Sequence, residues 1–575
     1  MNYSADIKIL PRTFLPQNFS ITDWENLEPY FIQLLETNIT SKSELNCWLK
    51  NSSELEAVIS EDACWRQIRM TCNIEDKKLE EALSFFMLHI QPKIQPYADL
   101  LNKKLLASPF VNELDISKFF TYLRSVKKNI DLFREANIPI QADLNILQLQ
   151  FGIISGKMTV SIDEKEYTLQ QAAKFLESDD RNVRASVYKK INDRRLQDKE
   201  SLNKLYTSLI EKRHQVAINA GFLNYCDYKF SELGRFDYSK EDCFQFHDAV
   251  KQYVLPLVNE IYKRKKNRLN LDSLRPWDIE AHAADEKTLT PFLTEQELIE
   301  KTIHCFDKLH PFFGDCLRKM KTLERLDLSS RKGKAPGGYN CPLAESGAPF
   351  IFMNAAGKMD DLTTIVHEGG HAIHSFLTHP LELSAFKEYP MEIAEVASMA
   401  MELFSMDHWN LFLPSEEELI QAKEHQLERV ITIFPWIATI DKFQHWVYEN
   451  PNHTIEKREL MWLNILNEFT PDALDVSDLE EYRKNSWQKQ LHLFEVPFYY
   501  IEYGIAQLGA IGLWMQFKTD KEKSLQNYCS ALALGGTKTL PELFTAAGLN
   551  FNFSPNSVKT LMDFVHKELL LLQKQ

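Results

Sequence analysis

Long apolar runs are missing from this 575-residue sequence: nowhere do about 18 consecutive apolar residues occur, the length that a membrane-spanning helix requires. The first residues, Met1 to Leu10, also lack a basic segment followed by an apolar stretch, so they do not resemble a secretory signal. We therefore expect a soluble cytoplasmic protein with no membrane partner.

An excess of basic residues is missing as well. Lys and Arg together number 66 against 81 Asp and Glu, which gives a formal net charge of −15. Binding to a phosphate backbone relies on Lys and Arg that replace counterions, so this balance excludes a typical nucleic-acid partner. It mainly favours solubility and says little about the substrate.

Paired cysteines are also absent. The nine cysteines are an odd number, and no two have CxxC spacing. A disulfide framework usually requires an even set, and a thiolate zinc site usually requires closely spaced pairs, so neither is indicated. The scattered pattern is typical of a reducing compartment.

Helical periodicity, by contrast, is present along most of the chain. Apolar residues recur at helix spacing from Leu202 to Ala220, and another helical pattern covers Asn182 to Arg195. Strand signals are few: a hairpin pattern from Met158 to Leu169, and a short apolar run from Pro349 to Met353. The sequence therefore predicts a mainly α-helical fold with few strands.

The clearest chemical motif is the H-E-x-x-H pattern His367-Glu368-Gly369-Gly370-His371. On an α-helix, residues four apart lie on one face, about one turn from each other, so both imidazoles can reach one ion. Glu368 can then meet a water at that ion and act as a general base. The motif predicts a metal site with hydrolytic chemistry.

The surrounding residues favour a helix with one face in the core. An apolar stripe at helix spacing lies opposite the stripe of His367, His371 and His374, and Asp360 or Asp361 can cap the helix start. Glycine disfavours a helix interior by about 1 kcal/mol relative to alanine. Because Gly369 falls within the apolar stripe, we expect a neighbouring element to pack unusually close to this helix.

A catalytic zinc requires a third protein ligand and an open position for water. The segment Pro390 to Leu403 is apolar almost all round apart from its acids, which is typical of a buried helix. Its carboxylates Glu392, Glu395 and Glu402 share one face. A buried carboxylate requires a cation or hydrogen-bond donors. Spacing alone leaves open which of the three binds the metal, and each can also be a core carboxylate held by neighbouring side chains.

Together these residues resemble the oligoendopeptidase F and thimet oligopeptidase family of zinc peptidases, in its oligoendopeptidase F-like branch. The run from His367 to His374 is similar to the metal helix of that family, and Glu395 matches its third zinc ligand. Three more segments look like oligoendopeptidase F: Ser155 to Val160, Leu274 to Asp278, and Gly333 to Tyr339.

The resemblance implies a large multi-helical peptidase body with a deep substrate channel and a small β-sheet beside the metal helix. We expect an N-terminal helical region over residues 1–110, a helical region with the hairpin over 111–200, and the catalytic region over 201–575. A peptide substrate is expected to lie along the strand near Phe350 and Phe352, with Gly357 leaving room for it. Ordinary sheet structure is the alternative for that strand.

A cluster of aromatic residues follows near the C-terminus, where His492 precedes Tyr499, Tyr500 and Tyr503. A tyrosine hydroxyl or a histidine N–H can donate to the oxygen that becomes negative when water attacks a carbonyl. Such a cluster can equally be plain core. The resemblance implies catalytic roles for His492, Tyr499 and Tyr503, and we expect Tyr500 to contact substrate.

Our hypothesis is a zinc-dependent oligoendopeptidase that binds one Zn²⁺ through His367, His371 and Glu395, and that cuts short peptides with Glu368 as base. Its expected partners are oligopeptide substrates. The protein itself is expected to be a monomer or a weak dimer. Three alternatives remain: a carboxypeptidase-type exopeptidase on a related helical fold, a non-catalytic peptide-binding protein, and a structural-metal scaffold. The ligand set also accepts Mn or Co.

Overall fold

Helices joined by short loops make up most of the computed structural model, which describes residues 3–7 and 11–574. Contacts between residues group the chain into two units, each assembled from three stretches of sequence. Unit 1 comprises Met1–Glu135, Leu289–Leu419 and Ala506–Phe551, and unit 2 comprises Ala136–Thr288, Ile420–Ile505 and Asn552–Gln575. The prediction of a mainly α-helical chain is confirmed.

Unit 1 contains the small sheet and the helix with the H-E-x-x-H motif. Its elements are α1 (Trp24–Glu36), α2 (Lys42–Cys72), α3 (Lys77–Phe85), α4 (Gln91–Ala107), α5 (Ile116–Leu132), α13 (Glu295–Leu309), α14 (Pro311–Thr322), β3 (Leu326–Ser329), β4 (Tyr339–Cys341), β5 (Phe350–Ala355), α15 (Met359–Thr378), α16 (Ser384–Lys387), α17 (Met391–Ser405), α23 (Lys521–Leu532), α24 (Leu540–Ala546) and most of α22 (Tyr500–Thr519).

Unit 2 contains a two-stranded hairpin among helices. Its elements are α6 (Asn137–Gly156), β1 (Thr159–Ile162), β2 (Lys165–Thr168), α7 (Leu169–Ala173), α8 (Arg181–Gln197), α9 (Lys199–Asn219), α10 (Tyr225–Glu232), α11 (Lys240–Ala249), α12 (Leu255–Arg268), most of α18 (Glu416–Glu449), α19 (Ile455–Glu468), α20 (Glu480–Lys484), α21 (Leu491–Glu495) and α25 (Pro555–Leu572).

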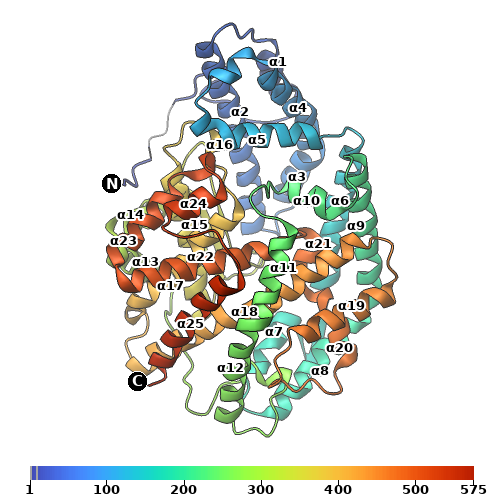
Figure 1. The fold of residues 1–575 in the computed structure, drawn as a ribbon, viewed down its shortest axis with the longest axis vertical. Helices are drawn as coiled ribbons and strands as arrows, with labels where there is room; N and C mark the ends of the chain where they lie inside the picture. The colour runs from blue at the N-terminus through green and yellow to red at the C-terminus, as the bar shows by residue number, and fades with distance from the viewer. Residues whose placement is uncertain (1–2, 8–10, 575) are drawn as a thin grey trace. The chain divides into compact units, whose positions relative to one another are not determined.

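The first helices of unit 1 enclose an apolar core of their own. Helices α1, α2, α4 and α5, drawn in blue in Figure 1, contribute buried side chains such as Phe31, Leu45 and Leu101 to it. The indole N–H of the buried Trp48 donates to the carbonyl oxygen of Leu34 at 2.9 Å, so α2 is tied to α1 by a polar contact as well as by packing.

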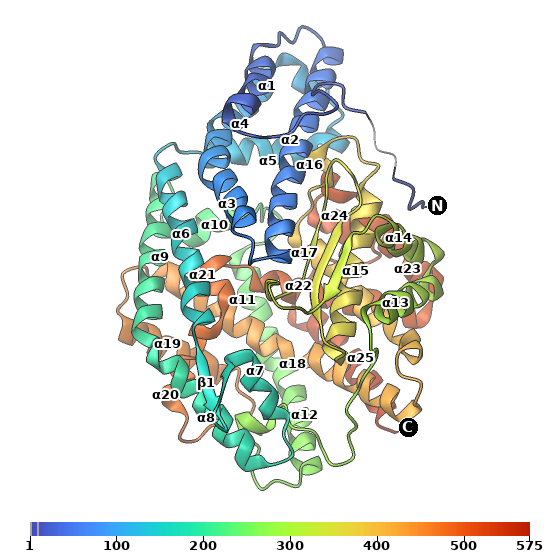
Figure 2. The same cartoon turned by 180° about the vertical axis from the view of Figure 1, so that it is seen from behind.

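The small sheet of unit 1 has the strand order β3-β5-β4, with β3 parallel and β4 antiparallel to the central β5. Its residues alternate between two faces. Phe350 and Phe352 pack with Ile68 of α2, whereas the strands lie beside α15, as the yellow elements in Figure 2 show. The predicted strand after Pro349 and the predicted sheet beside the motif helix are therefore confirmed.

The predicted hairpin in unit 2 is confirmed, with a two-residue turn. Thr159 pairs with Thr168 and Ile162 with Lys165, so only Asp163 and Glu164 connect the strands. Both have positive φ, 49° and 63°, as a type I′ turn requires. The second strand begins at Lys165, two residues before Tyr167, where the apolar pattern of the sequence resumes. It begins earlier because the turn needs only two residues.

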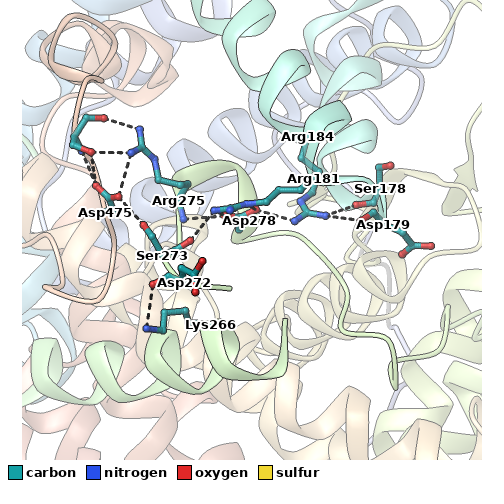
Figure 3. A network of polar contacts seen from close by, with 11 residues as sticks. Ser178, Asp179, Arg181, Arg184, Lys266, Asp272, Ser273, Arg275, Asp278 and Asp475 are labelled. Carbon is teal, nitrogen blue, oxygen red and sulfur yellow. Dashed lines mark hydrogen bonds and ion pairs between the residues drawn. The ribbon is translucent and has the colours of Figure 1, made fainter. Parts of the chain in front are cut away.

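A buried carboxylate organises the segment Leu274 to Asp278, one of those that resemble oligoendopeptidase F. The side chain of Asp278 is fully buried, and its oxygens accept from the guanidinium groups of Arg181 and Arg184 on α8, each at 2.8 Å (Figure 3). It also accepts from the main-chain N–H of Arg275 at 3.0 Å. A paired buried charge of this kind anchors the loop to α8, so the segment has a structural role in this unit.

Membrane-spanning helices and disulfides were the two features that the sequence did not indicate. Within residues 3–7 and 11–574, no helix combines the length and the apolar character that crossing a membrane demands. No disulfide joins any of the nine cysteines, all of which lie in the described part of the chain.

Candidate metal centre

The motif helix α15 is capped at its start by Asp361. The carboxylate of Asp361 accepts from the main-chain N–H groups of Ala356 and Lys358, at 2.7 and 2.8 Å. These bonds satisfy N–H groups that a helix start leaves without partners. Asp361 therefore closes a capping box from the third position of the helix, whereas the N-cap residue itself is Lys358 and not one of the two predicted acids.

Both glycines of the motif lie where another helix comes very close. A Cβ atom at Gly369 would meet the ring of Phe306, in α13, at 2.6 Å. A Cβ atom at Gly370 would lie 2.5 Å from the carbonyl oxygen of Ala397 and 2.6 Å from Cα of Ser398, both in α17. The unusually close neighbour expected at Gly369 is thus α13, and Gly370 lets the backbones of α15 and α17 touch.

The close approach of α17 brings Glu395 to the two motif histidines. Its Oε2 atom lies 3.5 Å from Nε2 of His367 and 3.8 Å from Nε2 of His371. One ligand atom from each of these three residues lies within 4.8 Å of the other two. The donor set of two imidazoles and one carboxylate fits a single Zn²⁺, because zinc prefers nitrogen and oxygen ligands in a compact arrangement.

A second carboxylate of α17 holds the first histidine in position. Oε1 of Glu402 lies 2.7 Å from Nδ1 of His367, on the side of the ring away from Glu395. Such a contact fixes the tautomer that presents Nε2 to a metal. The sequence places Glu402 among the possible ligands, and the structure makes it the orienting partner instead. Glu392 is buried on the same helix but does not belong to the metal-binding group.

Charges around the site set the protonation of the histidines. Burial opposes the charged form of His367, but the hydrogen bonds and charges of Glu395 and Glu402 outweigh it and hold the pKa of His367 well above its usual value. Burial lowers the pKa of His371 to about 4, so this ring is neutral near pH 7. A metal competes only with the proton on His367, since bound histidines must be neutral.

Glu368, the second residue of the motif, is largely buried. Burial raises the pKa of its carboxyl to about 7, and the nearby charges of Glu395 and Glu402 act in the same direction. A side-chain N–H of Asn340, in β4, donates to the carbonyl oxygen of Glu368 at 3.3 Å. The sequence offers no signal for Asn340, because it joins the site through sheet pairing that links separate segments.

The third histidine of the predicted stripe does not join the metal group. The His374 ring stacks on Tyr389 with centroids 3.5 Å apart and planes 14° from parallel. Burial holds its pKa well below the usual value. His374 is therefore a neutral core residue behind the site.

Phe350 and Phe352, the predicted substrate contacts, lie on the central strand of the sheet. Both side chains are buried, and over these residues β5 pairs with β3 on one side and β4 on the other. A peptide therefore cannot pair with β5 at these residues, because β3 and β4 already occupy its two sides. Among the described strands, none pairs with the outer side of β4, so the sheet edge beside α15 is β4.

Gly357 lies just after β5 in a conformation suited to glycine. Its φ is +87°, and a Cβ atom there would approach the carbonyl oxygen of Phe292 to 3.3 Å. The need for glycine at this position therefore follows from the backbone of the turn, and it does not by itself test the expected contact with substrate.

The predicted aromatic residues form one cluster in unit 2. The ring centroid of His492 lies 5.9 Å from Tyr499, 4.8 Å from Tyr500 and 6.0 Å from Tyr503. All four side chains are half-buried. Nδ1 of His492 is hydrogen-bonded to the side chain of Gln490 at 2.8 Å. The main chain just after His492 is fixed too, because the buried Arg213 donates hydrogen bonds to the carbonyl oxygens of Leu493 and Phe494.

We expect replacing Glu402 with glutamine to weaken metal binding. The neutral amide is a poorer partner for His367 Nδ1–H, and loss of such orienting partners typically lowers metal affinity about 10- to 100-fold. The measurement is the zinc dissociation constant by chelator competition. Glu392→Gln is the matched control on the same helix and should leave the constant unchanged; equal effects of the two changes would contradict the assigned role of Glu402.

Comparisons with known proteins point to one family. A family model described as Peptidase family M3 matches residues 174–562, and the model of the Peptidase M3 N-terminal domain matches residues 14–133. An oligoendopeptidase F homolog of Borreliella burgdorferi is 22% identical over 541 residues, which cover 90% of this chain and 83% of that protein.

Two further proteins extend the comparison. The oligopeptidase PepF of Bacillus subtilis is 22% identical over 416 residues, covering 71% of this chain and 60% of that protein. A solved structure of PZ peptidase A with an inhibitor superposes with a TM-score of 0.89 and 25% identity, over 96% of this chain and 98% of that one. The fold of that structure and the fold of this chain are thus the same nearly throughout.

Proposed function

The chain belongs to peptidase family M3, and on this basis we propose that it is a zinc-dependent oligoendopeptidase that hydrolyses internal bonds of short, unstructured peptides. The observation that carries the proposal is the compact group of His367, His371 and Glu395, with Glu368 on the same helix. The names of the relatives, oligoendopeptidase and oligopeptidase, support peptides as the substrate class.

In this proposal His367, His371 and Glu395 hold the ion, and the remaining position stays open for the reaction. Zinc, when bound, supplies a Lewis acid that polarises a carbonyl and makes water more acidic. Glu402 keeps the His367 ring oriented, and the hydroxyl of Ser398, 3.2 Å from Oε2 of Glu395, helps to hold the carboxylate. The protein thus contributes a preset geometry.

Glu368 acts as the general base. Its carboxylate takes a proton from the attacking water and returns it to the leaving amine nitrogen, so that the acid and base steps use one residue. Support comes from its place next to His367 in α15, close to the charges of Glu395 and Glu402, and from its burial, which raises the pKa of the carboxyl to about 7. A base with a pKa near the working pH can both accept and release a proton.

His492 and Tyr503 donate hydrogen bonds to the carbonyl oxygen as it becomes negative, and Tyr499 and Tyr500 contact substrate. The clustering of these four rings within unit 2 supports the assignment, as does the anchoring of His492 by Gln490. Rigid donors of this kind stabilise the transition state because little reorganisation is needed during the reaction.

We expect Tyr503→Phe to lower kcat by about 10²- to 10³-fold, the usual loss when one oxyanion donor is removed. KM should change little, because the hydrogen bond forms only as charge develops. Steady-state kinetics on a short peptide provide the measurement. Tyr482→Phe, which removes a hydroxyl bonded to Asp193 elsewhere in unit 2, is the control. An unchanged kcat would make Tyr503 an ordinary core aromatic.

The peptide lies along β4. Its outer edge has no partner strand among those described, and Asn340 joins this strand to Glu368. An extended peptide can add to such an edge through main-chain hydrogen bonds. This assignment keeps the predicted mode of binding and moves it from β5 to the neighbouring strand.

Cleavage of a short, internally quenched peptide blocked at both ends tests the function. Cleavage of the blocked peptide by zinc-loaded protein is the expected result and identifies an endopeptidase. Trimming of unblocked peptides alone would identify an exopeptidase instead, and binding without cleavage of either would identify a peptide-binding protein.

A further inference from the structure

A second group of metal-binding side chains lies in unit 2. Helix α11 carries Cys243 and His247, and helix α18 carries Asp441 and His445, so each helix contributes two residues four apart. This is the same spacing that brings the two histidines of α15 to one face. The exposed fractions of the four residues are 1, 2, 0 and 1%, so the group is closed to solvent.

Three of these residues are spaced like the residues of the candidate metal centre, and His247 is hydrogen-bonded to one of them. Ligand atoms of Cys243, Asp441 and His445 all lie within 4.8 Å of one another. Oδ2 of Asp441 lies 3.5 Å from Nε2 of His445 and 2.9 Å from Nε2 of His247. The separation at His445 is of the same size as the carboxylate–histidine separations of 3.5 and 3.8 Å at Glu395, whereas the separation at His247 is that of a hydrogen bond.

Several polar atoms of this group are buried without a hydrogen-bond partner among the described residues. They include both ring nitrogens of His445 and Oδ1 of Asp441. Rings of Phe230, Phe244 and Phe498 surround His445, with centroids 5.7, 5.0 and 5.1 Å from its own. Unsatisfied polar groups in such a setting are destabilising, because water cannot replace the missing partners.

We propose that Cys243, His247, Asp441 and His445 bind a second, structural Zn²⁺. Four protein ligands close the coordination sphere, which is typical of structural zinc and leaves no open position for substrate. The ion would bind one of the two ring nitrogens of His445 that lack a hydrogen bond among the described residues, and would link α11 to α18, which lie far apart in the sequence. This site is separate from the proposed catalytic one and does not depend on the peptidase activity.

The set of donors favours zinc over other common ions. A thiolate and two imidazoles exclude calcium and magnesium, which prefer oxygen ligands. The reading without metal is a buried network in which Asp441 bridges His247 and His445. In that network Nε2 of His445 lies 3.5 Å from Oδ2 of Asp441, and neither ring nitrogen of the buried His445 has a hydrogen bond to a described residue.

The test uses a chain whose catalytic ligands have been removed, His367→Ala together with His371→Ala. Wild type should carry two zinc ions per chain by elemental analysis, and the double variant should keep one. X-ray absorption of the double variant should show a sulfur neighbour at about 2.3 Å, the distance of a zinc–thiolate bond. No cysteine belongs to the catalytic group, so that sulfur signal reports the second site alone.

Cys243→Ser in the wild-type background should lower the zinc content from two to one and leave cleavage of the blocked peptide detectable. Cys316→Ser, at an equally buried cysteine in α14, is the matched control and should keep both ions. If Cys243→Ser fails to fold, the absorption spectrum of the double variant still decides the question. A folded double variant that holds no metal, a metal other than zinc, or zinc without a sulfur neighbour would overturn the proposal.

Discussion

Glu368→Gln is expected to abolish peptide cleavage while the protein keeps its catalytic zinc. Glutamine has nearly the same shape as glutamate but cannot take a proton from water. General base catalysis typically contributes about 10²- to 10⁴-fold to the rate, and the loss should reach the upper part of that range because one residue serves both proton transfers. The residue is not a metal ligand, so zinc binding should not depend on its charge.

The measurement compares kcat of wild type and Glu368→Gln on the blocked, internally quenched peptide, with zinc content assayed on the same samples. Asp360→Asn makes the same change from acid to amide in the first turn of α15 and should leave kcat close to wild type. If Glu368→Gln loses its zinc, the loss of activity would be explained by the missing metal and would not identify Glu368 as the base. Wild-type activity with zinc present would assign the base to another residue.

Gly370→Ala is expected to damage the site without touching any ligand. The added Cβ atom would meet backbone atoms of Ala397 and Ser398 at 2.5 and 2.6 Å, so α15 and α17 must move apart. Overpacking of this kind usually costs about 1–3 kcal/mol of stability. Because α17 carries Glu395 and Glu402, the shift also misplaces one ligand and one orienting group, and misplacement by about 1 Å can lower activity roughly 10²-fold.

Two other glycines separate this effect from a general intolerance of alanine. Gly369→Ala meets only the end of the Phe306 ring, so a side chain rather than a backbone must yield, and the loss should be smaller. Gly152→Ala, in α6, has nothing within 4 Å and should be neutral or stabilise by up to about 1 kcal/mol. Thermal unfolding, zinc affinity and kcat of the three variants give the comparison. Equal losses at Gly369 and Gly370 would contradict a backbone contact as the cause.

Features that depend on neighbours along the chain were predictable. The i, i+4 relation of His367 and His371 follows from helix geometry, and the helix itself from its apolar stripe and its capping acid. The hairpin between Met158 and Leu169 is local in the same sense, although its exact two-residue turn came from the structure. Even the glycines of the motif indicated a close neighbour, because a residue that disfavours the helix interior calls for a compensating contact.

Pairing between separate segments was not predictable in the same way. The apolar run Phe350 to Met353 reads equally as an edge or a central strand, and only the positions of β3 and β4 make it central. The central position of the strand is the reason why the side chains of Phe350 and Phe352 are buried. The contact of Asn340 with Glu368 could not be predicted, because it depends on β4 lying beside α15.

Spacing within single elements was enough to predict a mainly helical chain and a motif helix with two histidines one turn apart and Glu368 next to the first of them. The contact of Glu402 with Nδ1 of His367, and the place of Glu395 beside both motif histidines, come from the packing of α17 on α15. The tertiary structure likewise brought Cys243 and His247 to Asp441 and His445, as two short patterns nearly 200 residues apart. Both results have the same cause. The distance between two helices depends on the side chains that pack between them, and it cannot be calculated from the spacing of residues along either helix.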